Sequence, residues 1–235
     1  MSIRAIIFDM DGVLTDSEKF WKASIYNLAH QQIPEFTSEH QVMITGKSLN
    51  DIFKLLQQLF PERMKQVNKG EFFDRYEKHG LDEVYSRAKM IPGALNFLHK
   101  ASEKFPTALA TSAIGSWASE TLRRHDLRKY FCAIVTGDDV QRAKPDPEIF
   151  LRAAEMLQIP PAECLVIEDS YNGVEAGKKA RMTVWGFRNG FNDEQNLKSA
   201  DAIFSDFTTL KLPGMCTLKL PRKFRSCVKE QRFLN

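Results

Sequence analysis

The sequence predicts an α/β fold in which a doubly wound parallel sheet forms the core and an all-helical segment is inserted into it. From residue 92 onward, short apolar runs alternate with helix-forming segments, a pattern typical of parallel strands joined by helices. One more apolar run, residues 4–8, stands near the N-terminus. Since a single parallel strand cannot be buried alone, we expect this run to join the later strands, so that the helical stretch interrupts one domain.

The strands are expected at short runs rich in Ala, Val, Ile, Leu and Thr, namely residues 4–8, 107–111, 133–136, 164–167 and 183–187. Residues 18–89 contain many helix formers, and the apolar residues of 52–60 recur at helical spacing. We therefore predict a Rossmann-like core domain of residues 1–16 and 90–212, a helical cap domain of residues 17–89, and a basic C-terminal tail of residues 213–235.

The composition is that of an ordinary globular protein, with 43% of the 235 residues hydrophobic and 27% charged. The formal net charge of +3 is too small to indicate nucleic acid as the main partner. No apolar run reaches the roughly 18 residues that span a bilayer, and no signal peptide is visible. We therefore expect a cytoplasmic protein without a membrane partner. Separately, we expect a monomer or weak dimer, although the sequence carries no signal for the oligomeric state. The four cysteines are far apart and are expected to be reduced thiols.

Two aspartates, Asp9 and Asp11, directly follow the first predicted strand and precede Gly12. The carboxyl end of a strand is where open α/β sheets bind ligands. Two carboxylates one residue apart suit a site in which one attacks and the other moves a proton. An Asp-x-Asp-Gly segment by itself is equally typical of a simple turn, so its meaning depends on what the other strand ends carry.

Three more polar clusters stand at or near the ends of predicted strands. Thr111 and Ser112 end the second strand, where a hydroxyl and the N–H groups of a helix start can hold phosphate oxygens or simply cap the helix. Lys144 lies beside Pro145, which restricts the backbone and can direct the ammonium at an anion. Glu168 and Asp169 end the fourth strand and supply oxygen ligands for a hard cation.

With these four motifs in order over roughly residues 4–210, the chain resembles the haloacid dehalogenase superfamily of phosphotransferases. Within it, the chain is most similar to the branch of β-phosphoglucomutase and small sugar-phosphate phosphatases. The resemblance implies that Asp9 is the nucleophile that becomes aspartyl-phosphate and that Asp11 is the general acid and base. It also implies a phosphate-binding set, made of Thr111, Ser112, Lys144 and Asn172.

The same resemblance implies a Mg²⁺ cofactor held by Asp9, the backbone carbonyl of Asp11, Asp169 and Glu168. Such a cation, with Lys144, would offset the repulsion between an anionic carboxylate and an anionic phosphate ester. Glu168 either binds the cation, directly or through water, or hydrogen-bonds its own loop. Asp16 is expected to make a structural hydrogen bond. The five histidines show no metal-ligand spacing, and the basic tail is expected to be a solvated face, with an acidic partner as the alternative.

Phosphatase and mutase differ in how they hold a second phosphate, and three positions depart from the mutase pattern. Where the mutase has an arginine after the Gly-x-Ser of its cap, this chain has Leu49, which loses a bidentate phosphate contact that the nearby Lys47 replaces only in part. It has Trp21 in place of a histidine, and residues 113–115 lack the serine and asparagine side chains of the mutase. We therefore predict a Mg²⁺-dependent phosphatase of a small phosphorylated metabolite, a sugar phosphate, with Trp21, Lys47 and Ser48 facing the substrate.

Three other functions were weighed against this prediction. A β-phosphoglucomutase-type mutase is the alternative, because it shares the first half-reaction. A dehalogenase of the superfamily would not need Glu168, Asp169 or Asp11. A noncatalytic binding protein on the same fold would be expected to have lost Asp9 or Asp11, and the sequence retains both.

Overall fold

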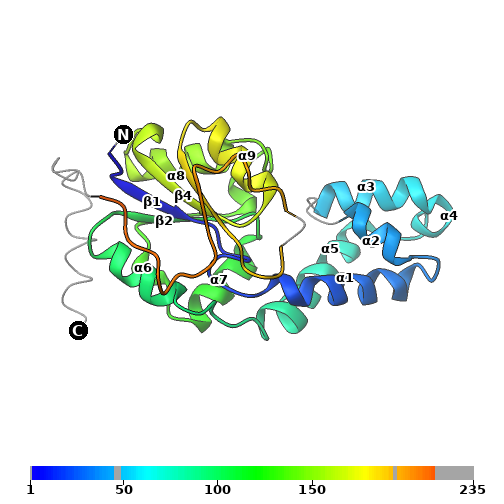
Figure 1. Cartoon of the computed structure of the whole chain (residues 1–235). Helices are drawn as coiled ribbons and strands as arrows, with labels where there is room; N and C mark the ends of the chain where they lie inside the picture. Colours follow the sequence, from blue (N-terminus) through cyan, green and yellow to red (C-terminus); the bar gives the residue numbers. More distant parts are fainter. Residues whose placement is uncertain (1, 45–48, 193–194, 215–235) are drawn as a thin grey trace. The chain divides into compact units, whose positions relative to one another are not determined.

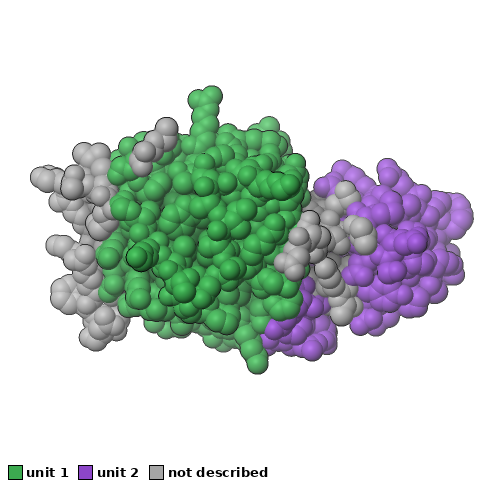
Figure 2. All heavy atoms as spheres, viewed as in Figure 1, with its two compact units in different colours: residues 1–16, 89–235 green, residues 17–88 purple. Residues whose placement is uncertain are grey.

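The computed structural model describes residues 2–44, 49–192 and 195–214 of the chain. It divides into two compact units (Figure 2). Unit 1 consists of residues 1–16 and 89–235, and unit 2 of residues 17–88. The chain therefore leaves unit 1 after its first strand and returns to it about seventy residues later.

A six-stranded sheet forms the centre of unit 1 (Figure 1), in the order β3-β2-β1-β4-β5-β6, and all its neighbouring strands are parallel. The strands are β1 (Ala5–Phe8), β2 (Thr107–Ala110), β3 (Ala133–Val135), β4 (Cys164–Glu168), β5 (Thr183–Phe187) and β6 (Ala202–Phe204). The predicted fold class is confirmed. Five strands lie within one residue of the predicted runs, whereas β6, a short and largely exposed edge strand, was not predicted.

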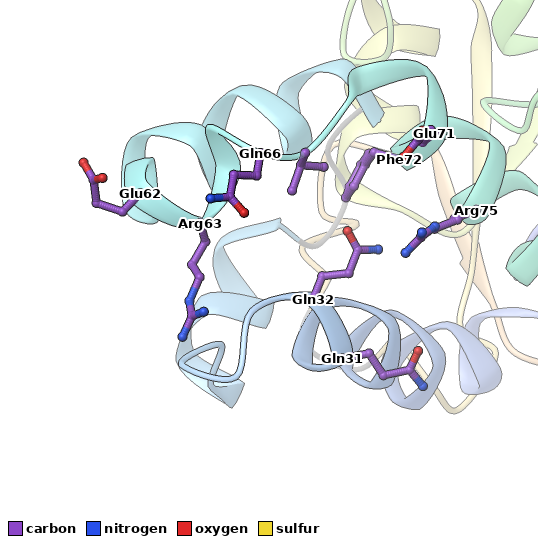
Figure 3. Close-up of a pocket in the computed structure, with 9 residues that line it drawn as sticks. Gln31, Gln32, Glu62, Arg63, Gln66, Glu71, Phe72 and Arg75 are labelled. Carbon is purple, nitrogen blue, oxygen red and sulfur yellow. The ribbon is translucent and has the colours of Figure 1, made fainter.

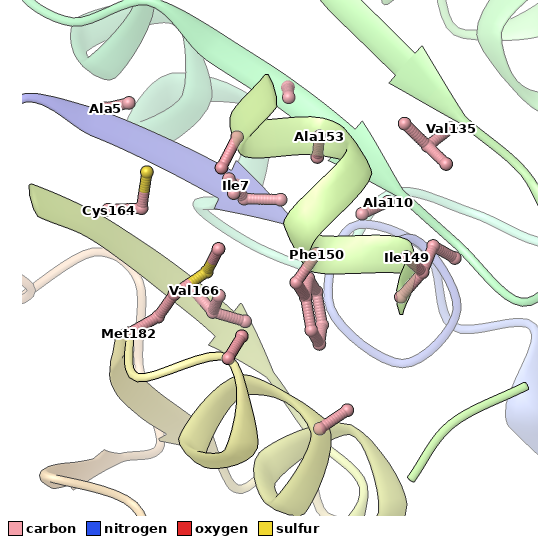
Figure 4. Close-up of a cluster of buried hydrophobic side chains, with 14 of the residues drawn as sticks. Ala5, Ile7, Ala110, Val135, Ile149, Phe150, Ala153, Cys164, Val166 and Met182 are labelled. Carbon is pink, nitrogen blue, oxygen red and sulfur yellow. The ribbon is translucent and has the colours of Figure 1, made fainter. Parts of the chain in front are cut away.

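Helices cover both faces of this sheet. Successive strand residues point to opposite sides, so the continuous apolar runs of the central strands need burial on both faces. On one face, Ile7 packs in a cluster with Phe150 and Val166 against α8 (Glu148–Leu157) and α9 (Tyr171–Lys179) (Figure 4). On the other face, the next residue, Phe8, packs edge-on against Phe97 of α6 and against Phe131. The helices of unit 1 are α6 (Ala94–Ser102), α7 (Gly115–Arg124), η2 (Arg128–Tyr130), η3 (Gly137–Asp139), α8 (Glu148–Leu157), η4 (Pro161–Glu163) and α9 (Tyr171–Lys179).

Unit 2 is entirely helical in its described residues. It contains α1 (Glu18–Gln32), α2 (Ser38–Ile44), α3 (Leu49–Leu59), α4 (Pro61–Met64), α5 (Lys69–His79) and the π-helical turn η1 (Gly80–Tyr85). The helix expected at residues 52–60 is α3, whose buried face presents Ile52, Phe53 and Leu56. Phe53 packs edge-on against Phe72 of α5 at 5.2 Å between ring centroids, so aromatic contacts join these helices.

Two features bear on the sequence expectations. Cys164 is a free, buried thiol, and burial raises its pKa to about 12. Among the described residues, no helix is both long and apolar enough to cross a membrane.

Candidate active site

The site residues of unit 1 follow strands whose ends are in register. Phe8, the last residue of β1, lies beside Leu109 of β2 and Ile167 of β4. The chain continues the ladder for one step, since the Asp9 N–H donates to the Ile167 carbonyl at 3.0 Å. Parallel strands therefore place Asp9, Thr111 and Glu168 at one edge of the sheet, as expected for a doubly wound fold.

Lys144 lies at the centre of this edge and is almost completely buried. It belongs to the loop between η3 and α8 and precedes Pro145 through a cis peptide bond. Its Nζ donates to Asp9 Oδ1 at 2.5 Å, to Glu168 Oε1 at 2.7 Å and to the Ala110 carbonyl at 3.3 Å. An ammonium has three protons, so these acceptors use all of them, and one oxygen of Asp9 is fixed.

The charges around Lys144 shift the pKa values of both partners. Burial alone would lower the pKa of Lys144, but the Asp9 and Glu168 carboxylates outweigh it and raise that pKa above its ordinary value. Burial raises the pKa of Asp9 well above its ordinary value; Lys144 lowers it in part, and Glu168 and Asp11 raise it further. Lys144 therefore stays protonated, whereas burial and the neighbouring carboxylates disfavour the ionised form of Asp9.

Glu168 uses both of its oxygens within the protein. Oε1 accepts from Lys144, and Oε2 accepts from the Asp169 N–H at 2.8 Å and from the N–H and Oγ of Ser170 at 2.8 and 3.0 Å. Gly173 leaves room for this carboxylate, because a Cβ there would lie 1.8 Å from Glu168 Oε1. The sequence left two roles open for Glu168, a cation ligand or a support for its own loop. The contacts seen here are those of a residue that holds Lys144 and its own loop.

The loop after Asp9 is shaped around Gly12. This residue has φ +79°, a conformation that favours glycine, and a Cβ there would lie 2.1 Å from Asp169 Oδ2. Its N–H donates to the Thr15 carbonyl at 2.8 Å. Gly12 therefore lets the loop reach Asp169, which is 5% exposed.

Thr111 and Ser112 differ in their surroundings. Thr111 is buried, and its Oγ1 accepts from the Ala113 N–H at 3.1 Å, so its hydroxyl proton points elsewhere. The first N–H of α7, that of Gly115, donates to Asp138 at 2.7 Å. Among the described residues, no backbone acceptor is found for the Ser112 N–H, so this group remains available to a phosphate oxygen.

Several predicted residues stand apart from this cluster. Asn172 lies in the first turn of α9, half-buried, and no hydrogen bond joins it to the other predicted residues within the described part of the chain. Lys47 and Ser48 lie outside the described residues, and Trp21 belongs to α1 although its side chain is not described. Asp16 makes the expected structural bond, because its Oδ1 accepts from the Lys89 N–H at 2.7 Å.

A cavity of about 640 Å³ lies within unit 2 (Figure 3). Gln32 of α1 and Arg75 of α5 point into it beside Phe72. None of the predicted site residues lines it. The buried carboxylates and Lys144 belong to unit 1, whereas every residue that lines this cavity belongs to unit 2.

Sequence reasoning missed two asparagines after β5. Asn189 Nδ2 donates to Asp169 Oδ2 and to the Gly12 carbonyl, both at 2.9 Å. Asn192, which is buried, donates to the Asp169 carbonyl at 2.6 Å and to the Phe187 carbonyl at 2.9 Å. The signal was available, since both residues follow the carboxyl end of a predicted strand, the position that identified the other clusters.

Comparison with known proteins shows the family of the chain. The family model described as haloacid dehalogenase-like hydrolase matches residues 6–187. The chain belongs to the haloacid dehalogenase-like hydrolase family. The predicted family and the predicted enzyme class, a hydrolase of this family, are therefore confirmed.

Individual relatives span nearly the whole chain. A Thermotoga maritima protein named phosphorylated carbohydrates phosphatase is 34% identical over 86% of this chain and 93% of its own length. The β-phosphoglucomutase of Bacillus subtilis is 30% identical over 89% of this chain and 92% of its own. The crystal structure of a putative β-phosphoglucomutase from Thermotoga maritima superposes with a TM-score of 0.68, at 32% identity, over 87% of this chain and 95% of that one.

Proposed function

We propose that this protein is a Mg²⁺-dependent phosphatase that hydrolyses a small phosphorylated metabolite, a sugar phosphate, through an aspartyl-phosphate on Asp9. The observation that carries the proposal is the contact of buried Lys144 with Asp9 at the strand ends. Lys144 fixes one oxygen of Asp9, which leaves the second oxygen to act as the nucleophile. The same ammonium would attract the anionic phosphoryl group toward Asp9.

The reaction would proceed in two displacements at phosphorus. In the first, an Asp9 oxygen attacks, the bond from phosphorus to the ester oxygen breaks, and Asp11 donates a proton to that leaving oxygen. In the second, Asp11 takes a proton from water as the water attacks the aspartyl-phosphate, which releases phosphate and restores Asp9. Thr111 and the Ser112 N–H would hold the phosphoryl oxygens. Lys144 would join them by exchanging its 3.3 Å bond to the Ala110 carbonyl for one to phosphate, and Asn172 stays a weaker candidate for that role.

The donor set fits a magnesium ion. Asp9, Asp169 and the Asp11 carbonyl offer only oxygen atoms, which Mg²⁺ prefers. The Lys144 ammonium contacts two carboxylates, those of Asp9 and Glu168, so a divalent cation would reduce the excess of negative charge. When bound, Mg²⁺ would also neutralise charge on the phosphate ester.

Histidine and cysteine play no part in this set. Among the described residues, no three His, Cys, Asp or Glu side chains are grouped as a metal site, and the proposed set needs only two carboxylates beside a backbone carbonyl. The contacts of Glu168 with Lys144 and Ser170 favour an indirect part for this residue, in which it holds the loop around the cation.

Hydrolysis is favoured over the mutase reaction by two lines of support. Residues 113–115 carry no side chain that would grip a second phosphate, and the relative at 34% identity is named as a phosphatase of phosphorylated carbohydrates. The mutase remains the second candidate because the Bacillus subtilis relative at 30% identity bears that name. In either case we propose that unit 1 is the catalytic core and unit 2 the cap, with Trp21, Lys47 and Ser48 selecting the substrate.

A phosphate-release assay tests the proposal. The purified protein should release phosphate from p-nitrophenyl phosphate and from a sugar phosphate with Mg²⁺ present, and not in excess chelator. Full activity in chelator would contradict the metal requirement. β-Glucose 1-phosphate with a bisphosphate activator separates the two candidates: net phosphate release supports the phosphatase, and conversion to glucose 6-phosphate without release supports the mutase.

A further inference from the structure

Asn189 joins two segments of the site that are far apart in the sequence. Its Nδ2 donates one hydrogen bond to Asp169 Oδ2 and one to the Gly12 carbonyl, both at 2.9 Å. A side-chain amide nitrogen carries two protons, so both are used. One side chain on the loop after β5 therefore links the loop after β1 to the carboxylate after β4.

The orientation of this amide is fixed by its other end. Asn189 Oδ1 accepts from the Phe191 N–H at 2.8 Å. Since a backbone N–H can only donate, the carbonyl oxygen of the amide must face Phe191 and the nitrogen must face Asp169 and Gly12. The alternative orientation would place two donors together at Phe191 and an acceptor against a carboxylate.

The peptide groups on the two sides of Gly12 are each held by one hydrogen bond. The Gly12 N–H donates to the Thr15 carbonyl, and the Gly12 carbonyl accepts from Asn189. In a trans peptide the carbonyl of one residue points opposite to the next N–H, so the Asp11 carbonyl points away from Thr15. Both peptide groups that flank Gly12 are thus held, one by Thr15 and one by Asn189.

The loop that carries Asn189 is itself well supported. The Asn189 N–H donates to Asn192 Oδ1 at 3.2 Å, and Asn192 in turn donates to the carbonyls of Asp169 and Phe187. Arg188 Nη1 donates to the carbonyls of Asn192 and Gln195 at 3.1 and 2.9 Å. These hydrogen bonds hold the turn that carries Asn189, so the direction in which its side chain points toward the site is fixed.

We propose that Asn189 is a positioning residue that fixes the Asp169 carboxylate relative to the Asp11–Gly12 segment, and that it thereby sets the affinity of the site for a divalent cation. This inference rests on the proposed function, since the groups that Asn189 holds belong to the proposed Mg²⁺ set. A freely rotating Asp169 side chain would lose conformational entropy when a cation binds. Because Asn189 already fixes this side chain, that loss does not oppose binding.

The test compares Mg²⁺ binding, measured by calorimetry without substrate, in wild type, Asn189→Ala and Asn189→Ser. The serine variant is the sharper one, because a hydroxyl at this position can still accept from the Phe191 N–H and preserve the turn. It is too short to replace the bonds to Asp169 and Gly12. The matched control is Asn196→Ala, which removes an exposed asparagine whose Oδ1 accepts only locally, from the Lys198 N–H.

We expect both Asn189 variants to bind Mg²⁺ about 10–100-fold more weakly than wild type, the usual loss when a residue that supports a metal ligand is removed. The Mg²⁺ concentration that half-saturates phosphate release should rise by the same factor, and excess Mg²⁺ should restore kcat. A general structural defect would not be restored in this way. Asn196→Ala should behave as wild type.

Two outcomes would overturn the inference, and only the second would also overturn the proposed function. If wild type binds Mg²⁺ and the dissociation constants of both Asn189 variants lie within about twofold of the wild-type value, the positioning role is wrong while the proposed function stands. If wild type binds no Mg²⁺ and releases no phosphate, the proposed function and the inference are both wrong.

Discussion

The two compact units bury different kinds of side chain. Unit 1 buries three carboxylates, Asp9, Glu168 and Asp169, at one edge of its sheet, with the Lys144 side chain only 6% exposed among them. In the described part of unit 2, Ser17 is the one residue counted as buried and polar. The core of unit 2 consists instead of packed aromatic and aliphatic side chains such as Phe53, Leu56 and Phe72.

The difference follows from what each backbone can offer. A buried charge is tolerated only when partners of fixed position satisfy it. Adjacent strand ends provide such partners, as when the Asp169 N–H and the Ala110 carbonyl bind Glu168 and Lys144. The N–H and carbonyl groups of a helix interior are already used within the helix. Unit 1 can therefore concentrate charge for chemistry, whereas unit 2 relies on apolar packing for its stability.

Asp9→Asn should produce the largest effect, a loss of phosphate release by more than about 10³-fold, because removing a nucleophile disables the whole reaction. The control is Asp74→Asn in unit 2, which replaces an exposed aspartate and should leave the rate unchanged. Substantial activity in Asp9→Asn would contradict the nucleophilic role.

The same variant tests the cost of the buried charge. The pKa of Asp9 is raised in the folded state, so its contribution to stability is fully present below its ordinary pKa and is lost as the pH rises through the raised value. In chelator, wild type should therefore lose stability with rising pH relative to Asp9→Asn. Denaturant unfolding at several pH values measures this, and parallel curves for the two proteins would contradict it.

Lys144→Met should lower the free energy of unfolding by about 3–5 kcal/mol, because it leaves two buried carboxylates facing each other without a cation. Denaturant unfolding in Mg²⁺-free buffer measures the loss. The double variant Lys144→Met with Glu168→Gln should recover part of it, since one of the two unpaired charges is then removed. No recovery in the double variant would show that the packing of Lys144, rather than its charge, supports the core.

Leu56→Ala tests the apolar side of the comparison. Leu56 is 1% exposed in the core of unit 2, and its truncation should cost about 3 kcal/mol of stability through lost burial and a cavity. Phosphate release from p-nitrophenyl phosphate should persist at temperatures where the variant is folded. The control, Met43→Ala, truncates a side chain that is 44% exposed and should change stability little.

The smallest effects are expected at two helix N-caps, one in each unit. Asn68 caps α5, where its Oδ1 accepts from two backbone N–H groups, and Ser170 caps α9 through the Gly173 N–H. Replacing either by alanine should cost about 1 kcal/mol. Only Ser170→Ala should also slow phosphate release, because Ser170 Oγ contacts Glu168 at 3.0 Å. Equal rates in both variants would place Ser170 outside the function of the site.

The sheet was predictable because its central strands are buried on both faces and therefore appear as continuous apolar runs, as in β1 and β4. β6 escaped prediction because it has three residues and a largely exposed pattern. The rule that strand ends converge predicted that Asp9, Lys144 and Glu168 lie near one another, but not that Lys144 Nζ bonds Asp9 directly. The sequence also left open whether Glu168 binds a cation or supports its loop, because the answer depends on where Lys144 Nζ and Ser170 lie in space. The same holds for Asn189, whose partners are 177 and 20 residues away.

Lys144 also differs from the other lysines in its chemical reactivity. Amine-reactive labels require a free, neutral and accessible amine, and Lys144 is enclosed and held as an ammonium by Asp9 and Glu168. Exposed lysines such as Lys54 and Lys65 should acquire such labels in the native protein. Lys144 should acquire one only after unit 1 has opened, so its labelling rate would report the integrity of the catalytic edge without any substrate.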